Sequence, residues 1–142
     1  MSSIKAHFTL LDHTADMGIK VTAPTLGALF ENAGRALMEV MIRKRPAGKT
    51  SLCRVTVSGD DLPDLMVRWL GEILYLFEGE GRVVMDIDVD AVIETGLDAT
   101  LHTVPFNPKR HEVATEIKAV TYHQIEVARN RDGWQATVIF DL

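Results

Sequence analysis

Two segments of this chain carry apolar side chains at steps of three and four residues, whereas much of the remaining sequence is rich in β-forming residues. Steps of three and four place side chains on one face of an α-helix, and strict alternation places them on one face of a β-strand. The chain must therefore combine two amphipathic helices with several strands. The two apolar stripes consist of Leu26, Leu29, Phe30, Ala33, Leu37, Val40 and Met41, and of Leu62, Leu65, Met66, Trp69, Ile73 and Phe77.

The residues that flank both stripes are typical of helix ends. Thr25 precedes the first stripe and can act as an N-cap, so we expect a helix over 25–41. The second helix follows Asp61, with Pro63 in the first turn, where a proline costs no hydrogen bond. The glycine-containing segment 79–81 is expected to end it.

The expected strands surround these helices and belong to one domain. A chain of 142 residues, 46% of them hydrophobic, has the size and composition of a single globular domain covering 1–142. We therefore predict an α+β fold in which the two helices cover one face of a mainly antiparallel or mixed β-sheet. The expected strands are 7–11, 18–22, 51–58, 83–94, 97–104, 112–120, 124–129 and 134–140.

Charge and cysteine content limit the possible partners and sites. The formal net charge of −5 disfavours a nucleic-acid backbone as the direct partner. Cys53 is the single cysteine, which excludes an intrachain disulfide and a cysteine-based zinc site. No apolar run reaches the length of a membrane span or resembles a signal peptide, so we expect a soluble, cytoplasmic protein without a membrane partner.

Two short motifs imitate known sites but lack required residues. Residues 48–50 (Gly-Lys-Thr) resemble the end of a phosphate-binding loop, yet the earlier glycine is replaced by Arg43 and a strand, not a helix, follows. Residues 86–90 (Asp-Ile-Asp-Val-Asp) resemble a calcium loop, yet its sixth position is Ala91 and its twelfth is Leu97. Strand alternation explains the aspartates better.

That alternation makes a definite prediction about the strand that contains these aspartates. Their side chains should face water, and the intervening apolar side chains should face the core. The residues expected to face inward are Ile87, Val89, Ala91 and Ile93.

Carboxylates gather at two places where strands end. Residues 12–16 (Asp-His-Thr-Ala-Asp) form a polar break between two expected strands, and the strand 138–140 is followed by Asp141 and by Leu142 with its terminal carboxylate. Oxygen ligands of this kind suit calcium or magnesium. The alternative is that the aspartates of 12–16 cap a turn while Asp141 is merely solvated.

Several blocks of the sequence resemble the archease family and occur in the family's order. They are 12–16, the helix 25–41, 69–81, 116–123 and 138–142, which together extend over nearly the whole chain.

The resemblance implies a metal site. The expected ligands of a divalent cation, calcium or magnesium, are Asp16, Asp141 and the terminal carboxylate of Leu142, with Asp12 close by. Isoleucine is common at the last position of the family, but a main-chain carboxylate should not depend on that difference.

The resemblance also implies a function. Archeases activate the GTP-dependent 3′-phosphate RNA ligase of tRNA splicing: they promote transfer of GMP to the ligase histidine and support multiple turnovers. This chain is therefore expected to be an activator and not an enzyme, with RNA reached only through the ligase. Lys118, Thr121 and His123 match a family block, and they either contact the partner or line a solvated strand edge.

Two other functions remain open on the sequence. A metal-dependent hydrolase would need a general base, for which His13 beside the carboxylates is the candidate. A general chaperone would need a broad exposed apolar patch, whereas the apolar stripes here are explained by core positions.

Overall fold

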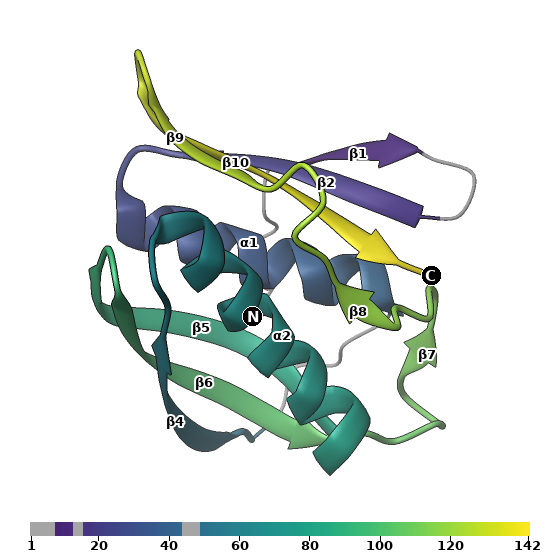
Figure 1. The fold of residues 1–142 in the computed structure, drawn as a ribbon. Coiled ribbons are helices and arrows are strands. Elements are labelled where there is room, and N and C mark those ends of the chain that lie inside the picture. The colour runs from purple at the N-terminus through teal and green to yellow at the C-terminus, as the bar shows by residue number, and fades with distance from the viewer. Residues whose placement is uncertain (1–7, 13–15, 44–48) are drawn as a thin grey trace.

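The computed structural model describes residues 8–12, 16–43 and 49–142, leaving aside the side chains of residues 11 and 12. Strands precede and follow each of the two helices along the chain, and both helices lie in the middle of the molecule (Figure 1). The elements are β1 (Phe8–Asp12), β2 (Asp16–Ala23), α1 (Leu26–Met41), β3 (Ile42–Arg43), β4 (Ser51–Ser58), α2 (Leu62–Glu80), β5 (Arg82–Ile93), β6 (Gly96–Pro105), β7 (Glu112–Val113), β8 (Ala119–Val120), β9 (Glu126–Asn130) and β10 (Gly133–Asp141).

The strands of the described residues form two larger sheets and one small pair. One sheet has the order β1-β2-β10-β8, with β9 also paired to β10, the other has the order β4-β6-β5, and β3 pairs with β7. All of these pairings are antiparallel. The predicted α+β class with two helices on antiparallel strands is therefore confirmed.

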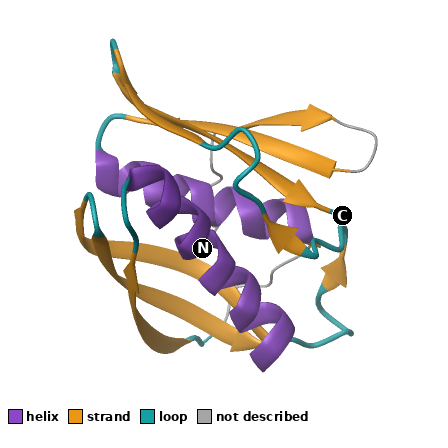
Figure 2. Cartoon of the chain, viewed as in Figure 1, coloured by secondary structure: helices purple, strands orange, loops and turns teal. Residues whose placement is uncertain are grey.

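We had expected the two helices to cover one face of a single sheet. They lie instead between the two larger sheets (Figure 2). Helix α1 contacts β5 on one side and β2 and β10 on the other. Its stripe is accordingly wider than the sequence spacing indicated, because Ala36 and Met38 outside the stripe are also fully buried. A helix buried on two sides can hold two sheets apart.

The predicted helix ends are confirmed. The Oγ1 of Thr25 accepts a hydrogen bond of 3.2 Å from the N–H of Ala28, and Asp61 caps α2 by accepting one of 2.9 Å from Asp64. At the other end of α2, Gly81 adopts a left-handed conformation with φ of 64°. Glycine reaches this conformation without the steric penalty that a Cβ would bring.

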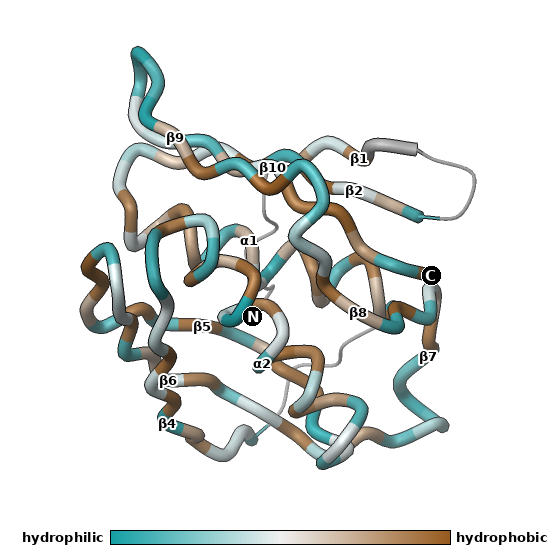
Figure 3. The backbone as a smooth tube through the Cα atoms, viewed as in Figure 1, coloured by the Kyte–Doolittle hydropathy of each residue, from teal (hydrophilic) through white to brown (hydrophobic). Residues whose placement is uncertain are grey.

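Trp69 is fully buried at the centre of the core. Its indole N–H donates a hydrogen bond of 2.9 Å to the carbonyl oxygen of Phe30, which ties α2 to α1. A side chain at Gly34 would run into Ile73 and Ile87, so this glycine allows α1 to approach its neighbours closely. The most hydrophilic stretches lie outside the core, at the tip of the β9–β10 hairpin and in the chain that leads to β7 (Figure 3).

Strand β5 departs from simple alternation. Asp86, Asp88 and Asp90 are exposed as predicted, but Ala91 and Ile93 are also exposed, which contradicts the inward positions we expected. The register of β5 on β6 shifts between Val89 and Ala91. Such a bulge adds one residue to one strand, so the side chains beyond it exchange faces.

The predicted strand 112–120 forms only at its two ends, as β7 and β8. Between them, Ala114 and Thr115 donate main-chain hydrogen bonds to the carbonyl oxygen of Met41, and Ile117 is fully buried. The segment is thus fixed by the end of α1 and by the core instead of by a ladder. Neither helix in the described part of the chain has the length and hydrophobicity that crossing a bilayer requires.

Candidate metal centre

Asp16 and Asp141 lie directly opposite each other, at the first position of β2 and the last position of β10. Side chains at directly opposite positions of an antiparallel pair share one face, with Cβ atoms about 4.5–5.5 Å apart. Asp16 is half-buried and Asp141 is exposed. The fold therefore brings together two aspartates that stand near the two ends of the sequence.

The neighbouring pair defines the face on which these carboxylates lie. Met17 is opposite Phe140, and Phe140 is fully buried among the core residues against which Met17 packs. Because side chains alternate along a strand, Asp16 and Asp141 belong to the opposite face of the sheet, away from the helices. A partner can reach that face without disturbing the core.

The end of β10 is held from both sides. Asp141 is opposite Asp16 of β2 on one side and opposite Ala119 of β8 on the other. The N–H of Lys118 also donates a hydrogen bond of 2.8 Å to the carbonyl oxygen of Asp141. Asp141 therefore has a defined position, and Leu142 follows it immediately (Figure 1).

The donors at this position fit a hard cation only as part of a larger set. Two facing carboxylates supply oxygen ligands of the kind that calcium and magnesium prefer. Among the described side chains, no group of three or more His, Cys, Asp and Glu residues is arranged to hold a metal ion. A cation at this position would therefore need further oxygen donors besides these two carboxylates.

Of the two further candidates in this region, Asp12 and His13, only the backbone of Asp12 is described. The backbone of Asp12 pairs with that of Met17, the residue next to Asp16, so β1 finishes at the end of the sheet where β2 begins. The side chain of Asp12 and the whole of His13 lie outside the described residues.

Lys118 and His123 lie on the chain that passes this site. Both side chains are exposed. Lys118 is tied by its main chain to Asp141, and His123 is placed by Thr121, whose hydroxyl accepts from the N–H of His123 at 3.2 Å and donates to the carbonyl oxygen of Ile139 at 2.9 Å. Lys118 therefore lies next to the carboxylates and His123 further along the same segment.

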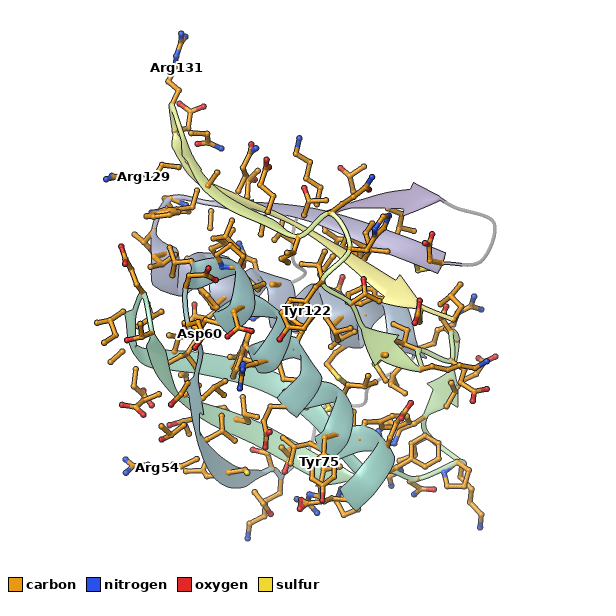
Figure 4. All side chains as sticks on the ribbon, in the orientation of Figure 1. Arg54, Asp60, Tyr75, Tyr122, Arg129 and Arg131 are labelled. Carbon is orange, nitrogen blue, oxygen red and sulfur yellow. The ribbon has the colours of Figure 1, made fainter. Side chains whose placement is uncertain are left out.

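Sequence reasoning missed the contact between Tyr122 and Asp64. The phenol donates a hydrogen bond of 2.6 Å to Oδ1 of Asp64 in the first turn of α2, and Tyr122 lies against this helix (Figure 4). The hydrogen bond from Tyr122 is the main cause that lowers the pKa of Asp64, and the same bond raises the pKa of Tyr122. No spacing in the sequence connects the two residues, although Tyr122 falls within the family-like block 116–123.

Comparisons with known proteins agree with this fold. Residues 8–142 match the model of the Archease protein family (MTH1598/TM1083). The chain is 35% identical to the protein archease of Methanosarcina acetivorans over the whole of both chains. It is 36% identical to that of Pyrococcus furiosus over 92% of this chain and 95% of the relative.

Two solved structures share the fold. Protein 1598 of Methanobacterium thermoautotrophicum superposes with a TM-score of 0.71 at 30% identity, covering 95% of this chain and 98% of that one. An archease of Thermotoga maritima, described as a possible chaperone, superposes with a TM-score of 0.65 at 23% identity, covering 93% and 94%. The fold and the sequence together define an α+β protein of the archease kind. The chain belongs to the archease family.

Proposed function

We propose that this protein is an activator of a GTP-dependent 3′-phosphate RNA ligase and acts through a carboxylate-bound divalent cation in tRNA splicing and RNA repair. The observation that carries the proposal is the direct pairing of Asp16 with Asp141 at a fixed strand end. The ligase as partner follows from the archease resemblance of the chain. Splicing of tRNA by such a partner would place the protein in the cytoplasm.

The proposed ligands are Asp16, Asp141 and the terminal carboxylate of Leu142, with Asp12 close by. Asp16 and Asp141 share one end of the sheet, and the end of β10 is held on both sides, so the positions of these two residues are set before a partner arrives. Calcium or magnesium bound there would supply positive charge for phosphate oxygens.

The residues of this chain would position groups in the partner's site and would not take part in the reaction themselves. Asp16 and Asp141 lie on the outer face of the sheet, where they can enter the partner's site and orient its cations or nucleotide phosphates for in-line attack. Lys118 and His123 are exposed on the adjoining segment and would contact the partner. GMP transfer and RNA joining would remain the chemistry of the ligase, and RNA would be reached only through it.

A chaperone is the second candidate, because the Thermotoga maritima archease is described as a possible one. A chaperone should expose one broad apolar patch. In the described part of the chain the exposed large apolar side chains come from β1, β4, β5, β7 and α2, from the segment after β8 and from the last residue. They are Leu10, Leu52, Tyr75, Ile93, Val113, Tyr122 and Leu142. This distribution favours the activator over the chaperone.

The test is the rate at which the cognate ligase is guanylylated with and without this protein. We expect stimulation by the wild-type chain, loss of stimulation with Asp141→Asn, and full stimulation with Asp132→Asn, an exposed aspartate at the other end of β10. Stimulation that survives Asp141→Asn would contradict the proposed site. Turnover of RNA by the chain alone would indicate a hydrolase, and protection of unrelated proteins from aggregation would indicate a chaperone.

A further inference from the structure

The segment between β7 and β9 crosses the end of β10 with little regular structure of its own. We call residues 114–125 the strap. Its strand β8 has only two residues, Ala119 and Val120, paired with Asp141 and Phe140. So short a ladder supplies few hydrogen bonds, and the strap must be held at its ends.

One end of the strap is held by α1 and by the core. Ala114 and Thr115 donate main-chain hydrogen bonds of 2.7 and 3.4 Å to the carbonyl oxygen of Met41. Ile117 follows and is fully buried. This anchor fixes the strap before it reaches Lys118 and the carboxylates.

Towards its other end the strap is tied to α2 by Tyr122, before Ile125 packs against the core and β9 pairs with β10. Tyr122 is 56% exposed, so packing of its side chain contributes little, and its phenol makes the 2.6 Å hydrogen bond to Asp64. Asp64 is itself oriented, because its Oδ2 accepts from the N–H of Asp60 at 2.8 Å and from Nε of Arg68 at 3.0 Å. The acceptor is thus in place before Tyr122 reaches it.

The hydrogen bond has the character of one made to a carboxylate. The pKa of Asp64 is lowered, mainly by the bond from Tyr122, and the pKa of Tyr122 is raised, mainly by the same bond. Both directions are those expected when a neutral phenol donates to an ionised acid, a type of bond that is short and stronger than one between neutral groups.

Tyr122 directly follows the residues of the strap that contact the end of β10. Thr121 beside it makes two hydrogen bonds to the carbonyl oxygen of Ile139, from its N–H at 3.0 Å and from its hydroxyl at 2.9 Å. Val120 pairs with Phe140, and Lys118 donates to Asp141. Release of Tyr122 would therefore loosen the whole series of contacts that ends at Asp141.

We propose that Tyr122 and Asp64 are positioning residues, whose hydrogen bond holds the strap on β10 and thereby fixes Lys118 and Asp141 for the partner. This inference rests on the proposed function only in its last part. The effect on the strap is a property of the isolated protein and can be measured without a ligase.

The chain offers a matched control for the hydroxyl. It contains two tyrosines, and Tyr75 on α2 is 57% exposed, almost the same as Tyr122. In Tyr75→Phe the remaining phenol is Tyr122, and its ultraviolet titration should lie at higher pH than that of an ordinary tyrosine, because the bond to Asp64 raises its pKa. Asp64→Ala should bring the titration of Tyr122 back towards that of an ordinary tyrosine.

Amide hydrogen exchange tests the strap directly. Loss of one hydrogen bond to a charged group should speed exchange at the amides of Lys118 and Thr121 about tenfold in Tyr122→Phe. Exchange at Val138, which lies in the β2–β10 ladder, should not change, and Tyr75→Phe should change none of these amides. Unchanged exchange at Lys118 in Tyr122→Phe would overturn the inference.

Guanylylation of the ligase tests the functional part. Tyr122→Phe should lower the stimulation several-fold while the protein remains folded, and Asp64→Asn, which keeps an acceptor for the phenol, should lose less than Asp64→Ala. Full stimulation by a variant whose Lys118 amide exchanges fast would also overturn the inference. Absence of stimulation by the wild-type chain would instead refute the proposed function, and exchange at Lys118 would then decide the role of Tyr122 alone.

Discussion

Asp16 and Asp141 face each other across β2 and β10, and their register is set by the core pair beside them. Met17 and Phe140 point towards the helices, and a slip of one residue would carry Phe140 out of the core. The position of the carboxylates is therefore maintained by packing on the other face of the sheet. Two carboxylates repel each other, so they can be held this close only because other contacts fix the register of the strands.

The first prediction concerns the cation. Calcium or magnesium should stabilise the wild-type protein, by about 2.7 kcal/mol when the free ion is at one hundred times its dissociation constant. Asp16→Asn and Asp141→Asn should each remove most of this effect, because each removes an anionic ligand. Thermal melts and calorimetry with and without the ion measure it, and Asp132→Asn serves as the control. Wild-type affinity in both site variants would contradict the ligand assignment.

The second prediction concerns the end of the chain. Glycines appended after Leu142 would convert its carboxylate into a neutral peptide carbonyl and move the charge away by about 3.3 Å or more per residue. Cation binding and ligase stimulation should fall steeply while the melting temperature stays close to that of the wild type, since an added tail costs little at a surface terminus. Leu142→Ile keeps the carboxylate and should behave as wild type. A tailed protein with full activity would restrict the site to the aspartates.

The third prediction separates core from site. Trp69→Ala should lower the free energy of unfolding by about 3–5 kcal/mol, because it leaves a cavity at the contact between α1 and α2. Tyr75→Ala, at an exposed position of the same helix, should cost far less. Asp16→Ala without added cation should also cost far less, because it removes one of two facing carboxylates. Denaturant melts measure all three, and the reverse order would show that the core is wrongly assigned.

The fourth prediction concerns His111, which is only 5% exposed. Its Nδ1 accepts a hydrogen bond of 2.9 Å from the N–H of Asn107, so this nitrogen carries no proton and the folded protein holds the ring neutral. Burial, with a smaller effect of Arg110, lowers the pKa of His111 below its ordinary value. On acidification the unfolded chain therefore takes up the proton before the folded chain does.

This difference sets the direction of the pH dependence. The contribution of His111 to stability should be complete above the pKa of an unfolded histidine, about 6.5, and should be lost as the pH falls from there towards the lower pKa of the folded state. Denaturant melts between about pH 7.5 and 5 should show a smaller decrease for His111→Phe than for the wild type. His123→Gln, which replaces an exposed histidine, serves as the control. An unaltered decrease in His111→Phe would refute the prediction.

Local sequence determined the helices and their ends. A helix and its ends depend on apolar spacing and on contacts within one or two turns, such as those made by Thr25, Pro63 and Gly81. These features can therefore be predicted from the sequence. The presence of a second sheet could not be predicted in the same way. A stripe reveals that a helix has a buried side, but only packing decides whether a second layer covers Ala36 and Met38 as well.

Long-range register accounts for the remaining differences. The bulge between Val89 and Ala91 exposes Ile93, and it exists only in relation to β6. The sequence of β5 does not locate it, because Ala91, Val92 and Ile93 are all apolar and any of them could face inward. A strand's faces are therefore certain only once its partner is known.

For the candidate site, too, one part follows from the sequence and another only from the tertiary structure. The sequence by itself determined which residues carry carboxylates at strand ends, because Asp16, Asp141 and Leu142 stand at the limits of β-rich segments. The tertiary structure decided that Asp16 faces Asp141 and that Tyr122 reaches Asp64. Both contacts join segments far apart in the chain. Such contacts form only when the register of β10 and the position of α2 have been set by the packing of the core, which no local pattern encodes.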